Sequence, residues 1–164
     1  MPSLPKNICW DGLFTGESVG PLLPEGKNAR LLMPADPTFD VFEKRSSTYC
    51  KIFVTSDLRE SFLAWAERRS SGKGTGWNHW GPSTTRIAAG DEGFVWDTGA
   101  SAVILCERPD LGGKPGRFKD QKYVELALIA KDAANTARTR ESLTTLIKQY
   151  ADFAKRELKC ANGA

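Results

Sequence analysis

The sequence predicts an α+β fold: a mainly antiparallel sheet of about six strands, packed by a long C-terminal helix and a short N-terminal helix. Three observations support this class. From Arg138 to Leu158, apolar residues recur at three- and four-residue steps, which indicates a long helix with one apolar stripe. Short apolar or alternating runs precede it, as in strands. The links between these runs are too short for helical crossovers, so neighbouring strands should be antiparallel.

The composition indicates one ordinary globular domain. The chain has 164 residues, and we expect a single domain over 1–164, with residues 1–8 as a loose lead-in and 9–160 as the folded core. The net charge of +3 is too small to predict a nucleic-acid partner. No apolar stretch approaches the roughly 18–20 residues of a membrane-spanning helix.

The N-terminal part predicts one short helix and two strands. A helix is expected within 10–23, with Thr15 as its cap and Ser18 in its first turn; Pro21 limits its length. The run 29–33 (ARLLM) predicts a short strand. The run 38–44 (TFDVFEK) alternates and predicts a second strand.

The middle of the chain predicts two longer strands and a polar loop. The run 47–55 (STYCKIFVT) is the strongest early strand signal. The run 60–69 (ESFLAWAERR) alternates, although its alanines and charged end also permit a helix. We favour a strand because the preceding residues read as a hairpin connection. A long polar loop is expected over 70–83.

The following segment predicts a hairpin and a central strand. The turn Asp97–Gly99 lies between the strand pieces 94–96 and 102–106. The run 122–131 (KYVELALIAK) is apolar on both faces, which favours a position in the middle of the sheet.

The cysteines predict two disulfides and export. Cys9, Cys50, Cys106 and Cys160 form no CxxC motif, and His79 is the single histidine, so we expect no metal site and no cofactor. Their even number favours two disulfides in an oxidising compartment. Three pairings are possible; we prefer Cys9–Cys50 and Cys106–Cys160, because each would tie a terminal segment to a strand.

Two groups of residues are candidates for catalysis. Ser18 stands in GESVG, a G-x-S-x-G match, but no buried strand precedes it as a nucleophile elbow requires. The acidic turn with Asp91, Glu92 and Asp97 could supply paired carboxylates, yet Asp- and Gly-rich turns commonly form for conformational reasons. We therefore predict no catalytic residue.

The polar loop holds the candidate binding residues. It fails as a phosphate-binding loop, because Lys73 is followed by Gly74 and not by Ser or Thr. Its second half carries Trp77, His79 and Trp80. Aromatic side chains on a polar loop can form a ligand platform or an interface hot spot, so we predict that these three residues bind a ligand or partner.

Four segments together resemble a group of uncharacterised exported proteins of actinobacteria. They are ICWDGLFTGESVGPLLP, TYCKIFV, GFVWDTGASAVILCE and LIKQYADFAKRELKC, which span most of the chain from Cys9 to Cys160. The resemblance implies a small lipoprotein-like or membrane-tethered extracytoplasmic domain with two disulfides. It implies no catalytic residues. Contact with a membrane would then be through an N-terminal signal or anchor that this chain lacks.

The expected function is a non-enzymatic extracytoplasmic module of the cell envelope, located outside the cell or on its surface. Its partner would be a protein, an envelope polymer or a small ligand. An alternative is a carrier of a lipid or small apolar ligand in a cavity between sheet and helix. The cavity would be lined by Phe94, Trp96, Val103, Leu105, Leu126 and Phe153. A less favoured alternative is a serine hydrolase that uses Ser18.

Overall fold

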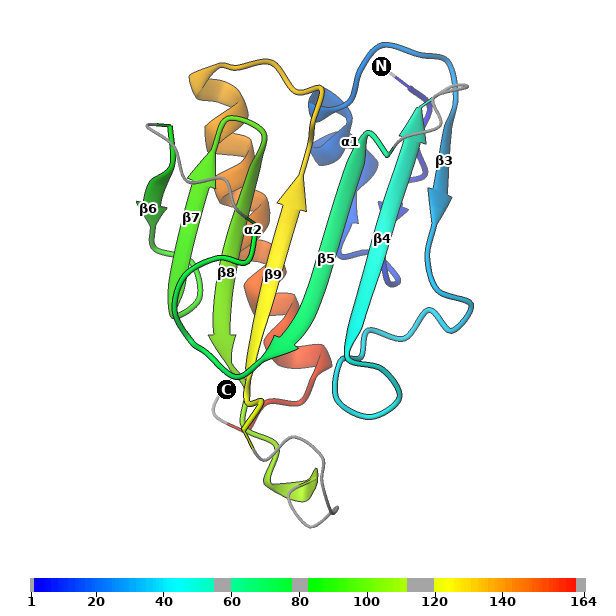
Figure 1. Ribbon diagram of the computed structural model, residues 1–164. Helices are drawn as coiled ribbons and strands as arrows, with labels where there is room; N and C mark the ends of the chain where they lie inside the picture. The colour runs from blue at the N-terminus through cyan, green and yellow to red at the C-terminus, as the bar shows by residue number, and fades with distance from the viewer. Residues whose placement is uncertain (1, 55–59, 78–82, 112–119, 162–164) are drawn as a thin grey trace.

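The main feature of the molecule is a seven-stranded antiparallel sheet with the strand order β3-β4-β5-β9-β8-β7-β6 (Figure 1). The computed structural model describes residues 2–54, 60–77, 83–111 and 120–161. The strands of this sheet are β3 (Ala29–Leu32), β4 (Ser47–Val54), β5 (Phe62–Arg69), β6 (Thr85–Ile87), β7 (Glu92–Trp96), β8 (Gly99–Leu105) and β9 (Tyr123–Ile129). The α+β class is confirmed, and the run 122–131 supplies the central strand as predicted.

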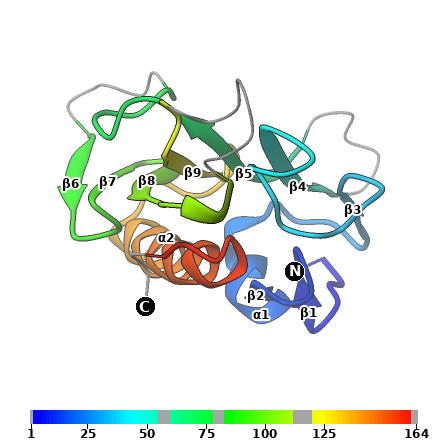
Figure 2. The same cartoon turned by 90° about the horizontal axis from the view of Figure 1, so that it is seen from below.

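One face of the sheet is covered by the helix α2 (Ala137–Glu157) and by the N-terminal segment, which lie side by side (Figure 2). α2 packs on β7, β8 and β9. The short elements outside the main sheet are β1 (Asn7–Ile8), β2 (Phe14–Thr15), α1 (Gly16–Val19) and the 3-10 turns η1 (Gly20–Leu22) and η2 (Pro109–Leu111). Gln149 Nε2 donates to the backbone carbonyl of Leu13 at 2.8 Å and links α2 to the N-terminal segment. We call the opposite side of the sheet the front face.

The main core lies between this layer and the sheet, and aromatic rings join its two parts. Tyr150 of α2 is fully buried. The rings of Trp10, Phe39 and Phe14 lie 5.8, 5.9 and 6.1 Å from it between centroids. Full burial of such a side chain stabilises a fold by roughly 1.5–3 kcal/mol. This cluster therefore holds the N-terminal segment against α2.

Two disulfides confirm the preferred pairing. Cys9 and Cys50 have their Cα atoms 5.6 Å apart and join the N-terminal segment to β4. Cys106 and Cys160 have theirs 4.7 Å apart and join the end of β8 to the chain beyond α2. The described part of the chain holds no free cysteine.

The N-terminal helix is shorter than the predicted span 10–23. Cys9, Trp10 and Asp11 have φ angles of 62°, 44° and 62°, in the left-handed region, so the chain turns sharply there instead of starting a helix. The predicted cap is confirmed: Thr15 Oγ1 accepts the backbone N–H of Ser18 at 3.1 Å.

The first eight residues are more ordered than a loose lead-in. Ser3 pairs with Asn28 in a parallel bridge, and Asn7 and Ile8 pair with β2. Ile8 is 2% exposed and belongs to the core. These pairings are short and leave little periodicity in the sequence, so they could not be predicted from it.

The strand predicted over 38–44 is absent, because Asp40 folds this segment back. The Asp40 carboxylate accepts the backbone N–H groups of Phe42, Glu43 and Lys44 at 2.8–2.9 Å. These local hydrogen bonds compete with strand pairing. Phe42 is buried together with its odd-numbered neighbour Val41, so the apparent alternation does not separate two faces.

The C-terminal helix agrees with the prediction to within one residue at each end. Thr136 caps it, since its Oγ1 accepts the backbone N–H of Thr139 at 3.1 Å. Lys155 and Arg156 occupy the last turn, where positive charge complements the helix dipole. The strands predicted at 29–33, 47–55, 60–69, 94–96 and 102–106 are also confirmed, although β8 already begins at Gly99, within the predicted turn.

Candidate functional site

The front face of the sheet is divided into a covered part and an open part. The segment 70–77, which follows β5 and which we call the strap, crosses the front of β9 and β8 (Figure 1). Phe94, Val103 and Ala127 are buried at 0–1% exposure, although strand alternation points them away from α2. No described segment crosses the front of β3, β4 and β5 in Figure 1. Of the side chains on these three strands, Arg30 is exposed, and Tyr49, Phe53 and Trp65 are partly exposed.

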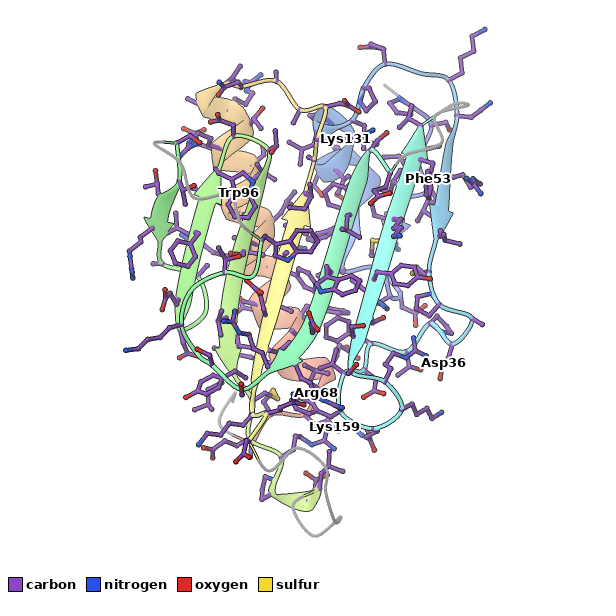
Figure 3. All side chains as sticks on the ribbon, in the orientation of Figure 1. Asp36, Phe53, Arg68, Trp96, Lys131 and Lys159 are labelled. Atoms are coloured by element: carbon purple, nitrogen blue, oxygen red, sulfur yellow. A yellow bond between two sulfur atoms is a disulfide. The ribbon has the colours of Figure 1, made fainter. Side chains whose placement is uncertain are left out.

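Strand alternation places two rings and one cation of β4 on the open part. Cys50 and Ile52 are fully buried against the N-terminal segment. Tyr49, Lys51 and Phe53 point to the opposite side and are partly exposed (Phe53 is labelled in Figure 3). One strand thus presents an aromatic, a basic and a second aromatic side chain in a row.

Two cations lie against these rings. Lys51 Nζ is 5.0 Å from the centroid of the Tyr49 ring. Arg30 of β3 pairs directly with Phe53 of β4, and its Cζ lies 4.7 Å from the ring centroid. Contacts of this kind contribute about 0.5–1 kcal/mol at exposed sites. They hold the positive charges among the rings, where an anionic ligand could meet both.

Two tryptophans extend the aromatic surface towards the strap. Trp65 of β5 is the direct partner of Tyr49 in the strand register. Trp77, at the end of the strap, meets Trp65 edge to face, with centroids 6.3 Å apart and an interplanar angle of 79°. We call the set formed by Arg30, Tyr49, Lys51, Phe53, Trp65 and Trp77 the aromatic face.

A small pocket lies beside the aromatic face. Its volume is about 230 Å³, and it is lined by the apolar side chains of Leu63, Trp77 and Ile129 and by the charged residues Glu60 and Lys131. Pockets that enclose drug-sized molecules are usually larger, about 300–1,000 Å³.

The predicted binding residues are only partly described. Trp77 lies on the aromatic face, whereas His79 and Trp80 lie outside the described residues. A binding role for the three residues stays a prediction. Tyr49 and Trp65 were not among the predicted binding residues, because only the pairing of β4 with β5 brings them together.

The acidic turn has structural partners. Asp91 accepts the backbone N–H of Leu105 at 2.7 Å. Asp97 pairs with Arg140 of α2 at 3.1 Å. Glu92 accepts the backbone N–H of Gly74 in the strap at 3.1 Å. These contacts fit the conformational interpretation of the turn.

Ser18 lines a groove of about 740 Å³ between α1 and the first turns of α2. Its Oγ donates to the backbone carbonyl of Thr15 at 2.9 Å. The charged groups along the groove are Glu17, Arg138 and Glu141, and none of the lining residues is a histidine. His79, the single histidine of the chain, lies outside the described residues.

The side chains expected to line a carrier cavity are on two sides of the sheet. Leu126 and Phe153 belong to the core between the sheet and α2. Phe94 and Val103 are buried on the front face of the sheet. The two pairs cannot line one common cavity, because the sheet lies between Leu126 and Phe153 on one side and Phe94 and Val103 on the other.

Two further properties of the described residues bear on function. No group of three or more His, Cys, Asp or Glu side chains among them could hold a metal ion. Neither helix within the described ranges is long and apolar enough to cross a membrane. Comparisons with protein-family models, with curated proteins and with solved structures found no match to this chain.

Proposed function

We propose that this chain is a non-enzymatic, extracytoplasmic binding module of the cell envelope, and that it holds an anionic polysaccharide along the aromatic face. The observation that carries the proposal is the arrangement of two cations among aromatic rings on the open part of the sheet, with Lys51 at Tyr49 and Arg30 at Phe53. The two disulfides suit an oxidising environment outside the cytoplasm. The resemblance to exported actinobacterial domains supports the same location.

The rings account for affinity towards a sugar chain. A pyranose ring presents a flat surface of C–H groups, which packs well on an aromatic side chain. Tyr49 and Trp65 are adjacent across two strands, and Trp77 stands beside them. An open row of rings contacts successive units of a chain, whereas a small free molecule is usually bound in an enclosing pocket.

The cations account for a preference for negative charge. Arg30 and Lys51 can each donate hydrogen bonds to a carboxylate, phosphate or sulfate group on the polymer. Both are accessible, so their contribution should fall as salt screens the charges. Acids near the aromatic face include Glu60, which lines the small pocket, and the exposed Glu67 at the far end of β5.

The test is a binding measurement with two polymers and a matched pair of variants. Polygalacturonate is the anionic probe, and dextran is the neutral one. Lys51→Ala removes a cation from the aromatic face, and Lys148→Ala removes an exposed lysine from α2, on the other side of the sheet. Affinity is measured by calorimetry, and circular dichroism verifies the fold of each variant.

The proposal predicts that polygalacturonate binds, that dextran binds more weakly, and that Lys51→Ala lowers the affinity for polygalacturonate about tenfold, or about 1.4 kcal/mol. Lys148→Ala should leave that affinity unchanged. Absence of binding to polygalacturonate, equal effects of the two lysine variants, or tighter binding of a single-stranded oligonucleotide would overturn it.

A further inference from the structure

Glu125 is a buried carboxylate at the centre of the front face. It lies on β9, and its side chain is 8% exposed. Burial of a charge is costly unless hydrogen bonds and an opposite charge compensate it. Here the backbone N–H of Gly76 in the strap donates to Oε1 at 3.0 Å and to Oε2 at 2.9 Å. Arg69 Nη1 lies 3.3 Å from Oε1.

The side chain of Arg69 also binds backbone carbonyl groups of the strap. Arg69, at the end of β5, donates to the carbonyl of Gly74 at 3.1 Å and to the carbonyl of Lys73 at 2.8 Å. Glu92 of β7 accepts the N–H of Gly74 at 3.1 Å. Side chains from β5, β7 and β9 thus bind the backbone of the strap at Lys73, Gly74 and Gly76.

The strap lies close to the sheet because it has glycine where contact is tightest. A Cβ at Gly76 would lie 3.0 Å from Glu125 Oε1. A Cβ at Gly72 would lie 2.6 Å from the ring of Tyr123, well inside contact distance. These glycines therefore allow the strap to pack closely on β9. At Gly76 the backbone of the strap reaches the Glu125 carboxylate.

Trp77 follows Gly76 directly, so the anchor is one residue from the aromatic face. The backbone N–H of Trp77 donates to Thr75 Oγ1 at 3.2 Å, which makes the three residues one local turn. We propose that Glu125 is a positioning residue: by holding Gly76, it sets the edge-to-face contact of Trp77 with Trp65. The predicted effect of Glu125 on polysaccharide affinity rests on the proposed function. Its predicted effect on the contact between Trp65 and Trp77 does not.

The experiment measures the ring pair without any ligand. Two coupled indoles give an exciton couplet in the far-ultraviolet circular dichroism spectrum, and Trp65→Phe identifies the part due to this pair. Glu125→Gln keeps one carbonyl oxygen as an acceptor, whereas Glu125→Ala removes both oxygens. The matched control is Glu67→Gln, because Glu67 is exposed and is the direct partner of Glu125 in the strand register.

Trypsin cleavage after Lys73 supplies a second readout on the same variants. Fragment 1–73 would contain the Cys9–Cys50 disulfide, and the remainder would contain Cys106–Cys160. No disulfide would join the two fragments, so a non-reducing gel separates them. Loss of one charge-assisted hydrogen bond should raise the opening of the strap, and hence the cleavage rate, about tenfold. Gly76→Ala serves as a further variant if Glu125→Ala does not fold.

We expect the Trp65–Trp77 couplet to be lost in Glu125→Ala, reduced in Glu125→Gln and unchanged in Glu67→Gln, with faster cleavage in the first two. An unchanged couplet and an unchanged cleavage rate in folded Glu125 variants would overturn the positioning role. A lost couplet with unchanged affinity for polygalacturonate would support the positioning role and would overturn the proposed function.

Discussion

Tyr49 and Trp65 lie directly opposite each other in the pairing of β4 with β5, on the side of the sheet that α2 does not cover. Directly opposed aromatic side chains interact, because their Cβ atoms are close and their rings share one surface. Both are partly exposed, so the same contact that stabilises the sheet also prepares a surface for binding.

A double-mutant cycle of Tyr49→Ala and Trp65→Ala should give a coupling free energy of about 0.5–1 kcal/mol for unfolding. Urea denaturation of the two single variants and the double variant measures it. A coupling near zero would show that the two rings do not interact in solution.

Tyr150→Phe should raise the free energy of unfolding by about 1 kcal/mol. The Tyr150 hydroxyl is fully buried, and no described residue hydrogen bonds to it. Removing an unsatisfied buried hydroxyl while keeping the ring retains the packing and removes the desolvation cost. Thermal unfolding measures the change. Tyr49→Phe, on the partly exposed ring, is the control and should change stability little; a destabilised Tyr150→Phe variant would contradict the prediction.

Because of Tyr150, the protein should also lose stability at high pH. Burial raises the pKa of Tyr150 well above its ordinary value of 10.0. Above about pH 10 the unfolded chain releases this proton while the folded chain retains it, so stability falls as the pH rises towards the folded-state pKa. Urea midpoints at pH 8 and pH 11 should therefore differ less in Tyr150→Phe than in the parent, and equal differences would refute this assignment.

Because of Asp40, the protein should lose stability in acid. Burial alone would raise its pKa, but hydrogen bonds from the backbone N–H groups of Glu43, Lys44 and Phe42 outweigh burial and lower the pKa below 3.8. A carboxylate with a depressed pKa stabilises the fold above its unfolded pKa, and this contribution is lost as the pH falls through the folded-state pKa. The decline in urea midpoint below about pH 4 should be smaller in Asp40→Asn. Asp152→Asn, an exposed change on α2, should show the parental decline.

Each disulfide should contribute about 4 kcal/mol to stability in the chain-entropy treatment, because the sequence separations are 41 and 54 residues. The paired variants Cys9→Ser with Cys50→Ser, and Cys106→Ser with Cys160→Ser, test the two bridges separately. Denaturant unfolding gives the loss for each. A loss below about 1 kcal/mol for either pair would show that the bridge does not constrain the unfolded chain as assumed.

Much of the fold could be predicted because its signals are local. The stripe on α2, the alternation in β4 and the apolar run of β9 each lie within one element. The failure at 38–44 has a specific cause, since the alternation of Phe39 and Val41 resembled a strand while the Asp40 side chain bound the following backbone. A single carboxylate decided the local structure there.

The candidate site was harder to predict because it depends on strand register. The sequence shows Trp65 and Trp77 in different segments and does not fix how β4 and β5 pair, so the aromatic face cannot be assembled from it. One signal was present: Glu125 is a lone acid within the apolar run of β9, and such a residue needs a partner when it is buried.

The most direct test of the aromatic face is an NMR titration of the labelled protein with a short oligogalacturonate. We expect shifts in the backbone amides of β3, β4 and β5, and in the indole N–H signals of Trp65 and Trp77. Shifts concentrated instead around Ser18 and Glu141, in the groove between α1 and α2, would contradict this expectation. So would the absence of any shift at saturating oligosaccharide.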